Sequence, residues 1–180
     1  MDPRLEDIER RLESARADLL ASLDAMPVSD WQRRAADGRW SVAEVLDHLA
    51  LVERRILQLL AAGGVNAPDP DVPPAGHAEP HTIDTAILLD RRTRVDAPDT
   101  FRPRLSPEPA AVLVQLAQVR LETLAFVRIA DAERLVNLRH PHFAIGVLNG
   151  LQWLDFIGGH ERRHTAQIAE SVAQLHAPSG

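Results

Sequence analysis

Two histidines near the C-terminal end, His160 and His164, have the residue type and spacing to bind one metal ion together. In an α-helix, residues four positions apart lie on one face, so both imidazoles can reach a common ion. A third histidine, His48, also lies among apolar residues. A hydrogen-bonded core histidine is the alternative for each position alone, but imidazoles packed together would each need a separate partner. The pattern therefore predicts a metal site formed by His48, His160 and His164.

Three nitrogen ligands leave at least one coordination position free, which is typical of catalytic rather than structural zinc sites. Imidazole suits zinc, nickel, iron and copper alike. We expect a divalent ion, with zinc or nickel first and iron or manganese as alternatives. Solvated side chains are expected for the other five histidines, which lie in predicted loops or at the C-terminal end: His77, His81, His140, His142 and His176. Of these, His140 and His142 are weak candidates for lining the mouth of the site.

The histidine pair also matches the H-E-x-x-H motif of zinc peptidases, in which the glutamate is the general base. That motif needs a third ligand on a separate downstream element, and the nearest downstream carboxylate, Glu170, lies on the same predicted helix. Such peptidases also align their substrate along a sheet edge, and the chain has no strand-like alternation of useful length. Glu161 is therefore interpreted as a residue of the helix surface rather than a peptidase base.

The composition excludes several chemistries, because the chain has no cysteine, no lysine and no tyrosine. Without cysteine there is no disulfide framework, no thiol nucleophile and no thiolate metal ligand. Without lysine there is no Schiff base, no pyridoxal-phosphate anchor and no P-loop lysine. An enzyme built from this chain must therefore rely on His, Asp, Glu, Ser, Thr or a bound metal.

The charge balance argues against a protein that binds nucleic acid. A formal net charge of −6 contrasts with the basic patch and high pI of nucleic-acid-binding proteins. Arginine pairs beside carboxylates, as in Glu53-Arg54-Arg55, are interpreted as solvated helix faces. The charged N-terminal residues do not resemble a secretory signal, and no uninterrupted apolar run approaches the roughly 20 residues that span a bilayer. We therefore expect a cytoplasmic protein with no membrane partner.

Apolar residues recur at spacings of three and four in four segments, which predicts amphipathic helices near residues 3–26, 42–62, 107–130 and 150–176. Capping residues mark three of their starts. Ser41 with Glu44, and Asn149 with Gln152, have the spacing of capping boxes. Ser106 is followed by a proline at the expected first helical position.

A long connector at residues 64–106 separates the second and third predicted helices. Nine of the 13 prolines lie between Pro68 and Pro109, so regular helix is disfavoured there, although Ile83 to Leu89 can form a short helix. A connector of this length can run from one end of a bundle to the other. The expected architecture is an all-α four-helix bundle, a single domain at residues 1–180, with one long proline-rich crossover.

Two groups of residues resemble the DinB-like (DinB/YfiT) superfamily of metalloenzymes. The segment Trp40–Leu49 is similar to its second-helix signature, and the closing half of the chain has matching features at His140-Pro141, Gly146, residues 152–157, His160 and residues 164–168. The resemblance covers nearly the whole chain. It implies up-down-down-up topology, homodimerisation, and one metal ion held by three histidines, which correspond here to His48, His160 and His164. It implies neither a polymerase nor DNA binding.

The resemblance also implies a range of activities. Some relatives are metal-dependent transferases or isomerases that use a low-molecular-weight thiol such as bacillithiol, mycothiol or glutathione. Our leading hypothesis is a metalloenzyme that activates a thiol or a water molecule for reaction with a small-molecule substrate. A metal-dependent hydrolase is the first alternative, and a non-catalytic, stress-related metal-binding bundle is the second. An apolar pocket leading to the metal would favour an enzyme, whereas a fourth side-chain ligand would favour a structural site.

Overall fold

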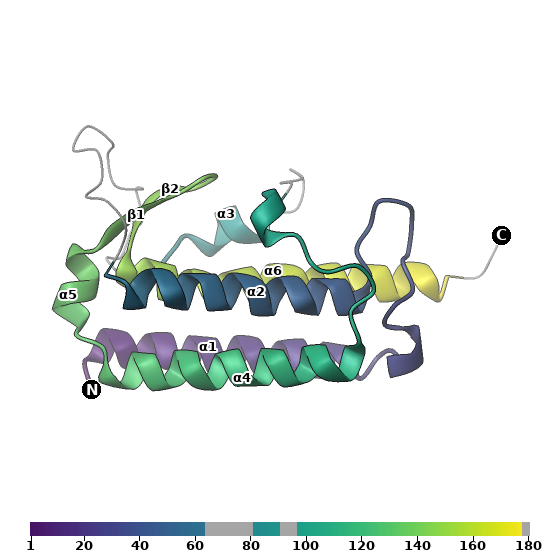
Figure 1. Ribbon diagram of the computed structural model, residues 1–180, viewed down its shortest axis with the longest axis horizontal. Helices are drawn as coiled ribbons and strands as arrows, with labels where there is room; N and C mark the ends of the chain where they lie inside the picture. The colour runs from purple at the N-terminus through teal and green to yellow at the C-terminus, as the bar shows by residue number, and fades with distance from the viewer. Residues whose placement is uncertain (64–80, 91–96, 178–180) are drawn as a thin grey trace.

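Four long helices form the body of the protein in a computed structural model that describes residues 1–63, 81–90 and 97–177. The long helices are α1 (Pro3–Leu23), α2 (Val42–Ala61), α4 (Pro109–Ile129) and α6 (Gly150–Leu175). Figure 1 shows α1 and α6 running in one direction and α2 and α4 in the other. α2 packs against both α4 and α6, and α1 packs against α6. The predicted four-helix bundle with up-down-down-up topology is confirmed.

The apolar stripes predicted from the sequence form the bundle core. On α1, the stripe residues are at most 1% exposed: Leu5, Ile8, Leu12, Ala15 and Leu19. Fully buried leucines of the other long helices pack in the same interior, including Leu46, Leu116, Leu151 and Leu154. Burying one such side chain stabilises the fold by about 1.5–3 kcal/mol. Packing of these faces, more than intrinsic propensity, therefore holds the helices together.

Both predicted capping boxes are present. The Ser41 hydroxyl accepts from the backbone N–H of Glu44, whose carboxylate accepts from the N–H of Ser41. Asn149 and Gln152 exchange the same pair of bonds at the start of α6. These bonds satisfy backbone donors that a helix end leaves free. They therefore fix where α2 and α6 begin relative to their histidines.

Two helix boundaries differ from the prediction. α1 ends at Leu23, three residues earlier than expected. α4 begins at Pro109 rather than two residues before it, and Glu108 is extended, with φ −66° and ψ 121°. A proline disfavours the helical conformation in the residue that precedes it. The helix therefore starts at the second of two nearby prolines, and Glu108 takes the N-cap position.

Smaller elements complete the fold: η1 (Val28–Asp30), α3 (Thr85–Leu89), η2 (Asp99–Phe101), α5 (Ala132–Asn137), and an antiparallel hairpin of β1 (Arg139–His142) and β2 (Gly146–Asn149). The short helix expected within residues 83–89 is confirmed by α3. The expectation of no strands was wrong for the hairpin. Its strands have four residues each, which is too short for a period of two to be recognised in the sequence.

α4 is the most apolar of the long helices. By length and composition alone it is the one helix among the described residues that could cross a membrane. Its inner face packs in the bundle through residues such as Val112 and Leu116. On its outer face, Val114, Leu121 and Ile129 are 69%, 65% and 85% exposed. Core packing thus accounts for the apolar inner face, while the outer face carries apolar side chains of its own.

Contacts along α6 dock the segment around α3 on the bundle. The backbone N–H of Ile83 donates to Oδ2 of Asp155 at 2.8 Å, and Nε of Arg11 donates to Oδ1 of the same residue at 2.6 Å. Leu88 lies against Gly159, where an added Cβ would come within 2.5 Å of the leucine Cδ1 atom. α3 therefore lies beside the part of α6 that carries the histidine pair, and Figure 1 shows this short helix next to α6.

Gly150, the first residue of α6, lies too close to α5 for a larger residue. An added Cβ would lie 2.8 Å from the carbonyl oxygen and 3.1 Å from the Cα of Leu135. We expect Gly150→Ala to lower the free energy of unfolding by about 1–3 kcal/mol, because backbone has to shift. Gly158→Ala is the matched control, since its nearest neighbour is 3.5 Å away and alanine favours a helix by about 1 kcal/mol. Urea unfolding compares the two variants, and equal stabilities would contradict the prediction.

Candidate metal centre

The three predicted ligands, His48 of α2 and His160 and His164 of α6, converge on one point. Nε2 of His160 lies 3.3 Å from Nε2 of His48 and 3.2 Å from Nε2 of His164. All three ligand atoms lie within 4.8 Å of one another. In the part of the chain that the structure describes, no other group of three or more His, Asp or Glu side chains comes close enough to share an ion. The structure therefore brings together the residues that the sequence pattern selected.

Helix geometry explains this convergence. His160 and His164 lie one turn apart on the same face of α6, with ring centroids separated by 4.5 Å. The ring of His48 lies 5.1 Å and 4.9 Å from these two rings, because α2 packs directly against α6. The capping box at Ser41 fixes the start of α2 about two turns before His48.

Hydrogen bonds on the outer side of two rings fix their protonation. Nδ1 of His48 lies 2.6 Å from the carbonyl oxygen of Phe101, and Nδ1 of His164 lies 2.8 Å from Oε1 of Gln167. Both oxygens only accept, so each Nδ1 carries the hydrogen of the neutral ring. The Nε2 atoms of His48 and His164 therefore present lone pairs to the centre of the cluster. Such outer partners are typical of metal-binding histidines.

The donor set fits a divalent cation. Two nitrogens bound at about 2.05 Å to a tetrahedral ion lie about 3.3 Å apart, which matches both distances from Nε2 of His160. A hydrogen on that nitrogen could be donated to only one of its two neighbours at a time, so one lone pair would face it without a bond. A cation removes this conflict, because all three Nε2 lone pairs can point toward it.

Aromatic rings flank the histidines. The indole of Trp40 lies against His48 and His164, with ring centroids 4.8 Å and 6.5 Å away. Phe156 stacks on His160 at 5.2 Å. Apolar rings restrict the access of water and lower the local dielectric constant, which strengthens electrostatic interactions at the centre.

Burial keeps His48 and His160 neutral at pH 7. It is the main cause that lowers the pKa of His48 below its usual value, and the hydrogen bond to the Phe101 carbonyl opposes this shift only in part. Burial also lowers the pKa of His160 well below its usual value, and the proximity of His164 and His48 adds to this effect. Neutral imidazole is the form that binds a metal, so these shifts favour binding at neutral pH and somewhat below it.

The metal-free protein is expected to lose stability as the pH falls below about 6.5, the pKa of an unfolded histidine. Folding lowers the pKa of His48 and His160, and burial lowers that of His142 to about 4. The unfolded chain therefore binds these protons first, so stability is complete above pH 6.5 and decreases as the pH drops toward 4. At pH 5.5 we expect a loss of about 1 kcal/mol for each histidine that stays neutral. Urea unfolding at pH 7.5 and 5.5 measures this loss, which His142→Phe should reduce; a pH-independent midpoint would contradict it.

Glu161 does not lie on the helix surface, so that interpretation was wrong. It is 1% exposed, and its carboxylate accepts from Nε of Arg16 at 2.6 Å and from Nη2 of Arg120 at 2.9 Å. One residue along a helix turns a side chain by about 100°, which directs Glu161 to a different face from His160 and into the bundle interior. Because guanidinium groups hold both of its oxygens, it is not available as a peptidase base. Glu53, interpreted as part of a solvated face, is also buried and binds the same two arginines.

His142 and His140 lie in β1, and one of them comes near the cluster. The ring of His142 is half-buried rather than solvated and packs on Phe156 at 4.8 Å, one ring away from His160. Its Nδ1 accepts from the backbone N–H of Ala144 at 3.1 Å, so Nε2 carries the hydrogen of the neutral ring. His140 packs instead on Trp153 at 5.8 Å. Both rings are half-buried, so the prediction of solvated side chains was wrong for both, and His142 is the one that packs next to the cluster.

The three other histidines do not join the cluster in the described part of the chain. His176 is exposed, as predicted. His81 is half-buried, and its Nε2 lies 3.6 Å from a carboxylate oxygen of Asp7. The prediction for His77 lies outside the described residues.

Two hydrogen-bond acceptors of the ligand histidines were not predicted from the sequence, the carbonyl of Phe101 and the side chain of Gln167. The carbonyl of Phe101 gave no signal, because every residue has one and the segment lies in the proline-rich connector. Gln167 had a usable signal, since residues three apart on a helix are neighbours and it follows His164 at that spacing. Trp40 was recognised as part of the α2 signature, but its contact with two ligand rings was not.

Gln167→Ala is expected to weaken zinc binding by about 10- to 100-fold, which is the usual effect of removing an outer partner of a ligand. The substitution leaves Nδ1 of His164 without its acceptor, so the ring is free to rotate and to change tautomer. Gln174→Ala, an exposed position on the same helix, is the matched control and should leave affinity unchanged. Competition with a zinc chelator measures both variants. Equal affinities would show that Gln167 does not orient His164.

Fold and site together define a class of protein, a helical bundle with parallel second and third long helices and three histidines that converge between α2 and α6. The chain belongs to the DinB superfamily, whose family profile matches residues 11–168. The matched range includes all three histidines and both capping boxes.

Two relatives from Bacillus subtilis extend this comparison. The uncharacterized protein YuaE of strain 168 is 29% identical over 141 residues, which cover 73% of this chain and 76% of that protein. The solved structure of YfiT aligns with a TM-score of 0.60 and 16% identity, over 97% of this chain and 89% of YfiT. YfiT is described as a probable metal-dependent hydrolase with an unusual four-helix bundle topology. At this level of identity, the similarity to YfiT supports the fold.

Proposed function

We propose that this protein is a metal-dependent enzyme that activates a low-molecular-weight thiol for transfer to, or isomerisation of, a small-molecule substrate. His48, His160 and His164 are the proposed ligands of a divalent ion, zinc or nickel. One observation carries the proposal: the cluster consists of three imidazoles and, among the described residues, contains no carboxylate.

The lack of a nearby free carboxylate favours a thiol over water as the nucleophile. Water in a metal-dependent hydrolase is normally deprotonated with the help of a carboxylate base. Two carboxylates adjoin the ligands in the sequence, Glu161 and Asp47, and both already have hydrogen-bond partners. Glu161 binds Arg16 and Arg120, and Asp47 accepts from the backbone N–H of Arg104 at 2.8 Å. A thiol has a pKa of about 8.5 and needs far less assistance to ionise. When bound, a divalent ion would supply the rest by lowering the pKa of a thiol in its open position.

The ligand set and the rings around it favour binding of a thiolate. Three neutral imidazoles leave the double positive charge of an ion uncompensated, so an anionic sulfur in the remaining position is favoured. Trp40 and Phe156 shield the centre from water, which strengthens that attraction. The thiol has to come from solution, because the chain contains no cysteine. In the transfer, the sulfur forms a bond to an electrophilic carbon, the leaving group departs with the bonding pair, and the thiol proton passes to solvent.

A panel of small thiols and carbon electrophiles tests the proposal. Zinc- and nickel-loaded protein should accelerate thioether formation above the background rate, with metal-free protein as the reference. His48→Ala and His164→Ala should lose the acceleration, whereas His176→Ala should keep it. The thiol hypothesis would be contradicted if every combination of thiol and electrophile gave product only at the background rate.

A metal-dependent hydrolase is the second candidate, and the similarity to YfiT, described as a probable hydrolase of that kind, favours it. The same variants should then lose hydrolysis of simple esters or amides, with no response to added thiol. If neither reaction responds to metal, the remaining hypothesis is a non-catalytic metal-binding bundle. Cytoplasmic localisation and homodimerisation stay predictions from the sequence.

A further inference from the structure

Two adjoining pockets, the first of them lined by Trp40, are rich in arginine. The first has a volume of about 220 Å³ and the second about 370 Å³, and Arg102 lines both. Together their walls carry five arginines, at positions 34, 39, 54, 102 and 104, against two carboxylates, Glu44 and Asp47. The chain as a whole has a net charge of −6, so this surplus of positive charge is local.

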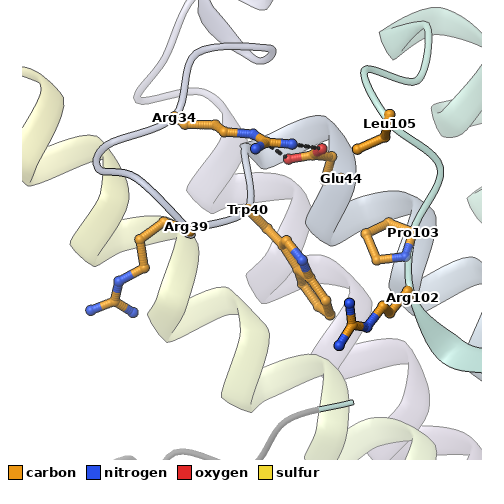
Figure 2. A pocket seen from close by; sticks show the side chains of 8 residues that line it. Arg34, Arg39, Trp40, Glu44, Arg102, Pro103 and Leu105 are labelled. Carbon is orange, nitrogen blue, oxygen red and sulfur yellow. Dashed lines mark hydrogen bonds and ion pairs between the residues drawn. The ribbon is translucent and has the colours of Figure 1, made fainter. Parts of the chain in front are cut away.

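The two carboxylates are already bound. Oε2 of Glu44 accepts from Nε of Arg34 at 3.1 Å, and Oδ1 of Asp47 accepts from Nε of Arg104 at 3.0 Å. Figure 2 shows Arg34 turned to Glu44 in this way. These pairs neutralise two of the five arginines and leave three to be accounted for.

The other three arginines have weaker partners or none that the structure describes. Arg102 pairs with Asp99 at 3.0 Å, but their side chains are 63% and 91% exposed, and such pairs contribute little. Arg39 and Arg54 have no carboxylate within ion-pair distance among the described residues. In Figure 2, Arg102 extends toward the indole of Trp40, while Arg39 lies at the rim and points away. Arg102 is therefore the charge best placed to meet a ligand inside the pocket.

The pocket is joined to the histidine cluster by two direct links. Trp40 forms a wall of the pocket and lies against His48 and His164. Arg102 follows Phe101, whose carbonyl accepts the Nδ1 hydrogen of His48. A ligand held by Arg102 would thus lie beside the indole, with the cluster on the other side of the same residue.

We propose that the pocket beside Trp40 binds an anionic oxygen group, a carboxylate or a phosphate, of the substrate that reacts at the histidine cluster. Arg102 is the main contact, Arg39 adds attraction from the rim, and Arg54 adds it from the adjoining pocket. Guanidinium groups offer paired donors that match both kinds of oxygen group, and a local positive field raises the concentration of anions at the site. The part of this inference that concerns a thiol substrate rests on the proposed function. Binding of an anion in the pocket does not require that function.

Two matched thiols that are long enough to reach around the indole test the proposal, 6-mercaptohexanoate and the neutral 6-mercaptohexan-1-ol. Titration calorimetry on zinc-loaded protein should give a Kd about tenfold lower for the acid than for the alcohol. Arg102→Gln should raise the Kd of the acid about fivefold and leave that of the alcohol unchanged, and Arg102→Lys should have a smaller effect. Arg128→Gln, whose native side chain pairs with Glu9 of α1, is the control and should change neither. Equal affinity for both thiols, or equal loss of both in Arg102→Gln, would overturn the proposal.

A second measurement separates this proposal from the thiol hypothesis. If neither thiol binds zinc-loaded protein, the proposed thiol function fails, and the pocket is then tested on metal-free protein with succinate and inorganic phosphate. Either anion should change tryptophan fluorescence in a saturable way, Arg102→Gln should weaken the response, and Trp40→Phe should remove most of the signal. No saturable response to either anion would overturn the pocket proposal as well.

Discussion

Replacing His160 with alanine is expected to weaken zinc binding by about a thousandfold. His160 is the central ligand, because its Nε2 lies within 3.3 Å of the other two nitrogens. Structural zinc sites with four ligands bind with about 10–16 kcal/mol, or roughly 2.5–4 kcal/mol for each ligand. We assign the upper value to the central ligand, and about 4 kcal/mol is a thousandfold in Kd. The neighbouring rings offer no replacement, since Phe156 and Trp40 have no atom that ligates zinc. Chelator competition gives the affinity, and elemental analysis should fall from about one zinc per chain to near zero.

His81→Ala and His176→Ala are the matched controls, because both remove an imidazole outside the cluster. Both should retain about one zinc per chain and the affinity of the unmodified protein. Circular dichroism should show the same helical spectrum for all three variants, so that a loss of zinc is not a loss of fold. If the three variants contain equal zinc, the ion is not bound at the histidine cluster.

The helices and the ligands could be predicted because each depends on local spacing. A period of 3.6 residues marks a buried helix face, and the capping residues at Ser41 and Asn149 mark where α2 and α6 begin. The same period places His160 and His164 on one face. His48 was selected by its apolar neighbours and by the family resemblance of the segment Trp40–Leu49. Its position relative to the other two histidines became clear once α2 packed against α6.

The features that could not be predicted depend on contacts between distant segments. The acceptor for His48 is a backbone carbonyl 53 residues away, which no side-chain pattern reveals. Glu53 and Glu161 are surrounded in sequence by arginines that suggest a solvated face, yet both carboxylates point inward to arginines of α1 and α4. The strands β1 and β2 have four residues each and form by pairing with one another. They are too short to show the alternation of apolar and polar residues by which a longer strand is recognised in a sequence.

The buried charges give the second large prediction: Arg120→Met should lower the free energy of unfolding by about 3–5 kcal/mol. Arg120 is 5% exposed and donates to Glu53 at 2.8 Å and to Glu161 at 2.9 Å. Methionine fills much of the same space but leaves one guanidinium, that of Arg16, for two buried carboxylates. Breaking a buried pair by removing one partner has a cost of this size, which is a large share of the roughly 5–15 kcal/mol that stabilises a typical domain. Urea unfolding measures it, with the exposed Arg128→Met expected to change stability by less than about 0.5 kcal/mol.

A double variant separates the cost of unpaired charge from the loss of packing. In Arg120→Met with Glu161→Met, one arginine and one carboxylate remain, so Arg16 can still pair with Glu53 at 3.1 Å. Arg16 also donates to the carbonyl of Leu116 at 2.8 Å, which keeps α1 attached to α4 without Arg120. If unpaired charge is the cause, the double variant should be more stable than Arg120→Met alone, with a coupling energy of about 2 kcal/mol. Losses that simply add, or a loss below about 1 kcal/mol in Arg120→Met, would mean that an unpaired buried charge is not what destabilises the variant.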